Sequence, residues 1–166
     1  SGSGIQISLQ QFKKVLLRLQ NEEHAANINL VTPTHYAPSI AVALNELRDS
    51  GALNIPVVYN TSSFDSLEAL RLMKGAVDVY LADFKYASAL EAGKLSHASR
   101  YPEIALAAIE EMVAQVPVWE EDDEGLLLKG VIVRHLVLPG RVEESKHALA
   151  VLHECFGDNV RLSIMS

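Results

Sequence analysis

Apolar residues recur along the chain in two spacings that alternate from one segment to the next. Some segments place them three and four residues apart, which is the spacing of one helix face, as at Phe12, Val15, Leu16 and Leu19. Others hold short apolar runs rich in Val, Ile and Tyr, which are typical of buried strands. The pattern predicts helices over 8–21, 36–50, 64–74, 87–94, 102–116 and 142–156, and strands over 27–31, 56–59, 77–81, 131–138 and 160–164.

The segment 116–133 departs from this alternation. Two short apolar arms, 118–120 and 126–128, flank an acidic stretch that ends in Gly125, a residue type that accepts a positive φ in a tight turn. We therefore predict a β-hairpin inserted ahead of the strand over 131–138, with the acidic stretch in a solvated loop.

Strands that alternate with helices predict a mostly parallel sheet. A closed eight-stranded barrel takes about 250 residues, and this chain has 166. We therefore expect an α/β fold that is a partial (β/α) TIM-like barrel, with about five mostly parallel strands and a β-hairpin insertion. Residues 5–166 are expected to form this single domain, and 1–4 to be a linker or a cloning scar. Because the pattern starts on a helix and stops on a strand, a piece of a larger barrel is expected.

Composition and charge exclude several classes of function. The formal net charge of −7 and the absence of a basic stripe argue against a surface for nucleic acids or anionic membranes. Apolar runs stop well short of the roughly 20 residues of a membrane helix. Cys155 is the single cysteine, so an intrachain disulfide is excluded and a reducing cytoplasm is expected. We predict that Cys155 packs as a small apolar side chain and that the surface or helix caps hold His24, His97, His147 and His153.

Polar residues stand at the ends of four predicted strands. Parallel strands place their carboxyl ends at one edge of a sheet or barrel, where α/β proteins build their sites. The sequence therefore predicts a site at this edge. Its candidates are Thr34 and His35 after the first strand, Asn60 and Thr61 after the second, Asp83 and Lys85 after the third, and Arg134 on the fourth.

Four collinear segments around these strand ends carry a family resemblance. They read NINLVTPTHY at 27–36, VYNTS at 58–62, YLADFKY at 80–86 and VRHLVLPG at 133–140. Together they resemble the radical SAM proteins that are similar to pyruvate formate-lyase activating enzymes. The resemblance extends over nearly the whole chain, from about Ile5 to Ser166, and it implies a partial barrel fold.

The resemblance also implies a cofactor set and a reaction. Family members hold a [4Fe-4S] cluster on a Cys-x₃-Cys-x₂-Cys loop after the first strand, and the cluster binds S-adenosylmethionine (SAM) and splits it to a 5′-deoxyadenosyl radical for hydrogen abstraction. The implied partner of the longer protein is a glycyl-radical enzyme or another protein substrate. Cys155 matches no position of that loop, and cluster ligation needs several thiolates. We therefore expect a truncated radical SAM activating enzyme that is inactive as it stands, with no catalytic or metal-ligating residue of its own.

Carried over residue by residue, the resemblance places two pairs of polar residues against SAM. Thr34 and His35 stand where many relatives have a Gly-Gly-Glu segment, whose glycines and carboxylate are missing here. Asn60 and Thr61 match the position that binds the ribose and the methionine carboxylate in relatives. The structural alternatives are a helix N-cap for Thr34, a first-turn position for His35, and a turn with an N-cap for Asn60 and Thr61.

The remaining candidates carry charge. Asp83 and Lys85 lie two apart and face the same side of an extended strand, so each needs the other or a ligand. Arg134 and His135 point to opposite faces of the strand. We expect Arg134 to point into the barrel and to donate two hydrogen bonds to the SAM carboxylate. A plain ion pair at the strand end and an outward-pointing arginine are the structural alternatives.

Two other functions remain open from the sequence. A barrel aldolase or isomerase would use Lys85 as a Schiff-base amine beside Asp83. A non-catalytic fragment would cover its open sheet edges by self-association, because unpaired edge strands invite pairing.

Overall fold

A five-stranded parallel sheet forms the centre of the protein. The structure is a computed structural model that describes residues 5–166, so the predicted linker or scar at 1–4 lies outside the described residues. The strand order is β1-β2-β3-β5, with β6 beyond β5, and β4 pairs antiparallel with β5. This confirms the predicted parallel strands and the inserted hairpin. The strands are β1 (Ile28–Val31), β2 (Val57–Thr61), β3 (Val79–Asp83), β4 (Glu120–Glu121), β5 (Leu127–Leu136) and β6 (Arg161–Met165).

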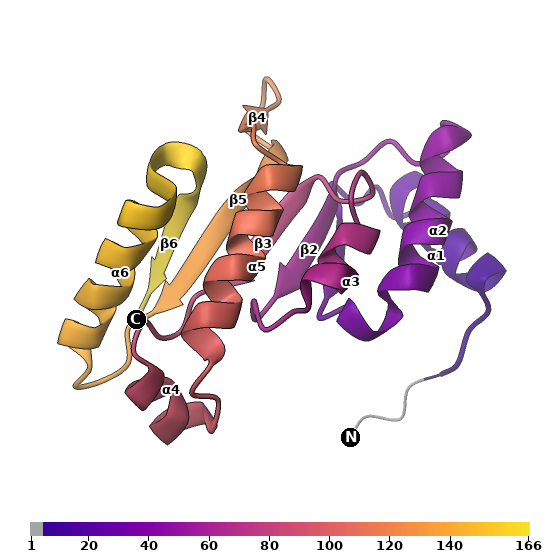
Figure 1. Ribbon diagram of the computed structural model, residues 1–166. Helices are drawn as coiled ribbons and strands as arrows, with labels where there is room; N and C mark the ends of the chain where they lie inside the picture. The colour runs from indigo at the N-terminus through magenta and orange to yellow at the C-terminus, as the bar shows by residue number, and fades with distance from the viewer. Residues whose placement is uncertain (1–4) are drawn as a thin grey trace.

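Helices cover one face of this sheet and leave the other open. Figure 1 shows α3, α5 and α6 in front of the strands, and α1 beside α2 next to the β1 edge. Each parallel connection carries a helix, so the chain is a partial TIM-like barrel of the kind predicted. The helices are α1 (Leu9–Asn21), α2 (Ala37–Asp49), α3 (Leu67–Leu72), α4 (Ala89–Ser96), α5 (Tyr101–Gln115) and α6 (Val142–Phe156), with short 3₁₀ turns η1 (Thr34–Tyr36) and η2 (Gly157–Asn159).

The core lies between the helices and the covered face of the sheet. Alternate strand residues point to it, and the parallel register aligns Leu30, Tyr59, Tyr80 and Val131 as neighbours across four strands. All four are buried, and the Tyr59 and Tyr80 rings lie 5.6 Å apart in a tilted arrangement. Burial of these large side chains stabilises the fold and fixes which strand face the helices cover.

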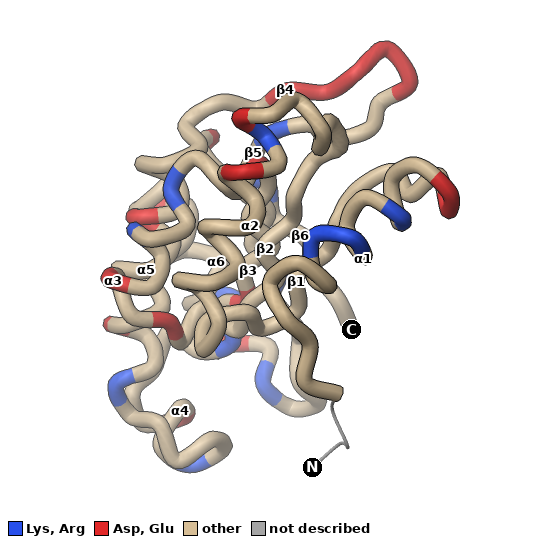
Figure 2. Tube along the Cα trace, turned by 90° about the vertical axis from the view of Figure 1, so that its right-hand side faces the viewer, with Lys and Arg blue, Asp and Glu red and all other residues tan. Residues whose placement is uncertain are grey.

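The β4–β5 hairpin covers part of the open face at the amino end of the strands. A Cβ at Gly130 would lie 2.6 Å from Trp119 Cε3, so the indole rests directly on the backbone of β5. The guanidinium carbon of Arg161, on β6, lies 5.2 Å from the centroid of the same ring. The tip of the hairpin projects away from the body and is acidic (Figures 1 and 2).

An ion pair fastens the same end of the sheet to α2. Arg48 Nη1 donates to Asp78 Oδ1 at 3.1 Å, a second guanidinium nitrogen contacts the other oxygen, and the Val57 backbone N–H donates to Asp78 Oδ2 at 2.7 Å. Asp78 thus links α2, β2 and the start of β3. The amino end of the sheet is therefore held by structural contacts, and its carboxyl end is left for a site.

Several predictions about single residues are settled here. Cys155 is exposed, so its predicted packing as a small apolar side chain is wrong, because its position on α6 faces away from the sheet. The four histidines predicted for the surface or caps are exposed, and His97 is the C-cap of α4 with φ 52°. Among residues 5–166, the helices are too short or too polar to cross a membrane.

Candidate functional site at the carboxyl end of the sheet

The structure divides the predicted site residues between the two faces of the sheet. Asn60 and Thr61 are consecutive on β2, so they point to opposite faces. Asn60 joins Asp83 and Arg134 on the open face, whereas Thr61 is buried on the helix-covered side with Thr34 nearby. His35 is exposed in η1. Five of the seven residues therefore form two clusters rather than one, and exposed His35 and Lys85 lie outside them.

The open-face cluster is a chain of contacts across three strands. Arg134 on β5 places Nε 2.8 Å and Nη2 2.7 Å from Asp83 Oδ1, and its Nη2 donates to Asn60 Oδ1 at 2.9 Å. The side chains of Arg134 and Asp83 are about a quarter exposed, at 25% and 22%. Arg134 thus points to the open face as predicted, and its present partners are protein groups.

Lys85 does not pair with Asp83. It lies two residues past Asp83, beyond the end of β3, and it is exposed. Within residues 5–166 its ammonium has no carboxylate partner, and the Asp83 carboxylate pairs through Oδ1 with Arg134 instead. Of these two charged residues, Asp83 therefore has an oppositely charged partner among residues 5–166, which is Arg134, and Lys85 has none.

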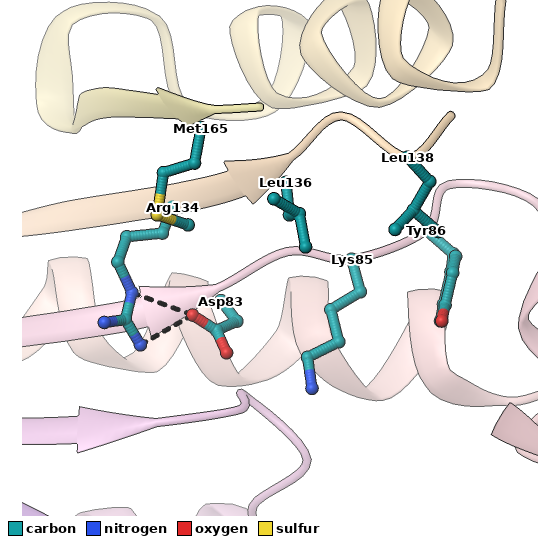
Figure 3. A pocket seen from close by; sticks show the side chains of 7 residues that line it. All are labelled: Asp83, Lys85, Tyr86, Arg134, Leu136, Leu138 and Met165. Atoms are coloured by element: carbon teal, nitrogen blue, oxygen red, sulfur yellow. Dashed lines mark hydrogen bonds and ion pairs between the residues drawn. The ribbon is translucent and has the colours of Figure 1, made fainter. Parts of the chain in front are cut away.

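A cavity opens beside this cluster, between the ends of β3, β5 and β6. Its volume is about 460 Å³, within the range of small-molecule sites. Figure 3 shows the Asp83–Arg134 pair at one end and the Lys85 and Tyr86 side chains further along. Apolar side chains complete the lining, from Leu136, Leu138 and Met165.

The second cluster is organised by Asp65, which the sequence analysis missed. The hydroxyls of Thr34 and Thr61 both donate to its carboxylate, and the Ser63 N–H donates to Thr61 Oγ1 at 3.0 Å. Asp65 is 6% exposed, so these contacts replace water. Thr34 therefore is not an N-cap, and it ties the loop after β1 to the loop after β2. Asp65 carried no distinguishing signal, since it stands in a polar turn before a helix.

Burial changes the acidity of the tyrosines in this region. Desolvation raises the pKa of Tyr59 to about 12, with a further upward contribution from the Asp65 charge. Desolvation also raises the pKa of Tyr80 and of Tyr101. These hydroxyls are held as neutral hydrogen-bonding groups, and they are unsuited to act as bases near neutral pH.

Tyr101, the first residue of α5, is a second residue that sequence reasoning missed. Its hydroxyl accepts from the Lys85 N–H at 3.0 Å and lies 2.9 Å from the Asp83 carbonyl oxygen and 3.0 Å from that of Ser62. It therefore holds the backbone at the carboxyl ends of β2 and β3, next to the open-face cluster. Its place before Pro102 suggested only the start of a helix.

The segment after β3 is fastened to β5 and to α6. His135, on the covered face of β5, places Nδ1 2.7 Å from the Phe84 carbonyl oxygen, and Glu144 Oε1 accepts from the Ala87 and Ser88 N–H groups at 2.8 and 2.9 Å. His135 Nε2 is buried without a partner beside a space of about 10 Å³, the size of one water molecule. These contacts hold the rim of the open-face cavity.

The residues present do not fit an iron–sulfur cluster. The chain holds one cysteine, which is exposed at the end of α6. Among residues 5–166, groups of three or more His, Cys, Asp or Glu side chains that would bind a metal ion are also absent. The open face fits a polar organic group better, because an unpaired ammonium, an amide and a carboxylate oxygen lie at its rim.

Comparisons with known proteins show which proteins this chain resembles in sequence and in fold. No family model matches the sequence. An uncharacterized protein of Methanocaldococcus jannaschii, MJ0674, is 32% identical over 123 residues, which are 73% of this chain and 31% of that protein. The chain therefore spans about a third of the length of the curated relative it matches.

Among solved structures, the crystal structure of methylornithine synthase (PylB) is similar to the whole of this chain. The TM-score is 0.63 at 10% identity, and the match covers 100% of this chain and 46% of methylornithine synthase. At that identity the likeness establishes the architecture. The chain has the fold of part of this larger α/β enzyme, a partial barrel whose strand ends carry the open-face cluster.

Proposed function

We propose that this chain is part of a radical SAM enzyme and that its open face forms one wall of the SAM and substrate chamber. The observation that carries the proposal is the convergence of Asn60, Asp83 and Arg134 at the carboxyl end of a partial barrel beside a cavity. The collinear sequence resemblance supports it. The likeness to methylornithine synthase supports the partial-barrel fold on which the proposal rests.

The residues of this chain would bind and orient the methionine part of SAM. The ammonium of Lys85 suits a carboxylate, and the Asp83 oxygen that is free of Arg134 suits an amino group. Arg134 holds Asp83 and Asn60 in place, and Tyr101 holds the backbone between Asp83 and Lys85. Thr34 and Thr61 support the rim from the covered side through Asp65, and exposed His35 stands outside both clusters.

The iron–sulfur cluster would have to come from residues other than those of this chain. A site-differentiated [4Fe-4S] cluster supplies the electron that cleaves SAM, and it needs three thiolates. Because the chain holds one exposed cysteine, we propose that these 166 residues alone do not cleave SAM. The activating-enzyme subtype, with a glycyl-radical or other protein as partner, is proposed from the sequence resemblance.

The test compares SAM binding and cleavage in two proteins. One is this chain, and the other is a version that carries a Cys-x₃-Cys-x₂-Cys loop ahead of residue 5, reconstituted anaerobically with iron and sulfide. We expect 5′-deoxyadenosine from the cysteine-containing version only, and a lower yield after Asp83→Asn, with Glu103→Gln as the matched surface control. A reconstituted protein with a full cluster that neither binds nor cleaves SAM would contradict the proposal.

The aldolase alternative loses its physical support. A Schiff-base lysine is activated by desolvation in an apolar pocket, whereas Lys85 is exposed at the rim. Borohydride reduction in the presence of small carbonyl compounds, followed by mass spectrometry, should modify Lys85 no more than exposed Lys14. A specific adduct on Lys85 that is absent at exposed Lys14 would restore this alternative.

A further inference from the structure

We propose that the open-face cavity binds an organic anion, a carboxylate joined to an apolar group, and that Lys85 rather than Arg134 binds the carboxylate. This inference names the ligand class of the proposed SAM and substrate chamber. Only the link between this ligand and the radical SAM reaction rests on the proposed function, because anion binding depends on the charge of Lys85 and on the apolar lining of the cavity.

Arg134 is already engaged. Two of its guanidinium nitrogens contact Asp83 Oδ1, and one of them also donates to Asn60. A ligand carboxylate that took Arg134 would leave Asp83, which is 22% exposed, with an uncompensated charge. Arg134 is therefore a positioning residue, and its charge is cancelled by Asp83.

Lys85 supplies the remaining positive charge. Its side chain lies further along the cavity than the Asp83–Arg134 pair (Figure 3), and within residues 5–166 it has no carboxylate partner. The Lys85 backbone is nevertheless held, since its N–H donates to the buried hydroxyl of Tyr101 at 3.0 Å. An ammonium on an anchored backbone beside a cavity is a suitable partner for one carboxylate.

The rest of the cavity is apolar and exposed. Leu136 is 46% and Met165 39% exposed, and Leu138 lies beside them in the lining. Large apolar side chains exposed next to a cation without a carboxylate partner among residues 5–166 favour a ligand that combines a carboxylate with an apolar portion. The cavity volume of about 460 Å³ accommodates such a small molecule.

The test titrates the chain with 4-phenylbutyrate and with its neutral amide, followed by ¹H–¹⁵N correlation spectra. We expect the acid to bind at least about tenfold more tightly than the amide, the size of one hydrogen bond to a charged group. Lys85→Met should abolish this difference and Lys14→Met, on the exposed side of α1, should preserve it. Leu136→Ser should weaken both ligands.

Three results would overturn the proposal: no binding of the acid, equal binding of acid and amide, or loss of the difference in Arg134→Gln with retention in Lys85→Met. Circular dichroism establishes that each variant is folded. A parallel titration of the reconstituted, cluster-containing version with SAM and with the acid separates this proposal from the previous one. If SAM fails to bind while the acid binds, the anion site stands and the radical SAM function is weakened. If the acid and SAM compete, the methionine carboxylate of SAM is the group that Lys85 binds. If both bind at the same time, Lys85 binds the carboxylate of a separate substrate.

Discussion

At the scale of single residues, side chains alternate between the two faces of each strand. This alternation decides whether a polar side chain at the carboxyl end of the sheet lies on the open face or in the core. Asn60 and Thr61 are neighbours in sequence, yet one contacts Arg134 on the open face and the other contacts Asp65 in the interior. Arg134 and His135 separate in the same way. A polar pair at a strand end therefore contributes one residue to the open face and one to the core.

The Asp83–Arg134 pair gives a stability prediction. Asp83→Asn should lower the free energy of unfolding by about 1–2 kcal/mol, because a partly buried guanidinium loses its counter-charge. Urea unfolding measures the loss, and the double variant with Arg134→Gln isolates the coupling. The exposed Arg100–Glu103 pair is the control, since Glu103→Gln should cause no measurable change. Equal effects at both sites would show that the open-face pair is unimportant for stability.

The buried tyrosines predict loss of stability at high pH. Burial raises the pKa of Tyr59 from an ordinary value of 10.0 to about 12, and raises that of Tyr80 and Tyr101 in the same direction. A raised pKa means that the folded state keeps the proton, so this stability is complete below pH 10.0 and falls as the pH rises toward about 12. Urea midpoints at several pH values measure it.

Tyrosinate absorbance at 295 nm provides the matching observation. Absorbance from the buried tyrosines should appear together with unfolding rather than before it. Tyr59→Phe should reduce the dependence of stability on pH, and Tyr36→Phe, at a side chain that is 71% exposed, should leave it unchanged. Full ionisation of all five tyrosines in a chain that is still folded would contradict the assigned burial.

At the scale of elements, β5 is the strand on which the site depends. It pairs with β3, β4 and β6, and it carries Arg134 on one face and His135 on the other. Its start belongs to the hairpin and its end reaches the cavity. The apolar pattern predicts two separate segments here, 126–128 and 131–138, whereas the structure has one ten-residue strand, Leu127–Leu136.

The contact of Trp119 with Gly130 tests the hairpin. Gly130→Ala should destabilise the protein by about 1–3 kcal/mol, because the added Cβ would lie 2.6 Å from the indole and the backbone has φ +155°. Gly93→Ala on α4 is the control: its Cβ meets Ser99 at an ordinary 3.7 Å, so it should be neutral or stabilising by up to about 1 kcal/mol. Thermal unfolding distinguishes the two. If Trp119→Leu fails to relieve the Gly130→Ala effect, the clash is not the cause.

At the scale of the whole molecule, β1 and β6 are the outer strands of the parallel part of the sheet. On β6, Leu162 is 42% and Ile164 57% exposed next to unpaired backbone. We therefore expect the isolated chain to self-associate through this edge. Sedimentation over a wide concentration range should show oligomers that Ile164→Lys weakens, whereas Leu90→Lys on α4, at a side chain that is 65% exposed, should not. A strict monomer at high concentration would contradict this expectation.

The sequence by itself determined the order of helices and strands, the parallel sheet, the hairpin and the edge that holds the polar residues. These follow from local spacings of two, three and four residues, which each segment carries alone. Tertiary structure decided that Arg134 pairs with Asp83, that Asp65 and Tyr101 organise the rim, that Trp119 covers Gly130 and that Cys155 is exposed. Those outcomes depend on strand register and helix placement, which bring together residues far apart in the chain and which no local spacing encodes.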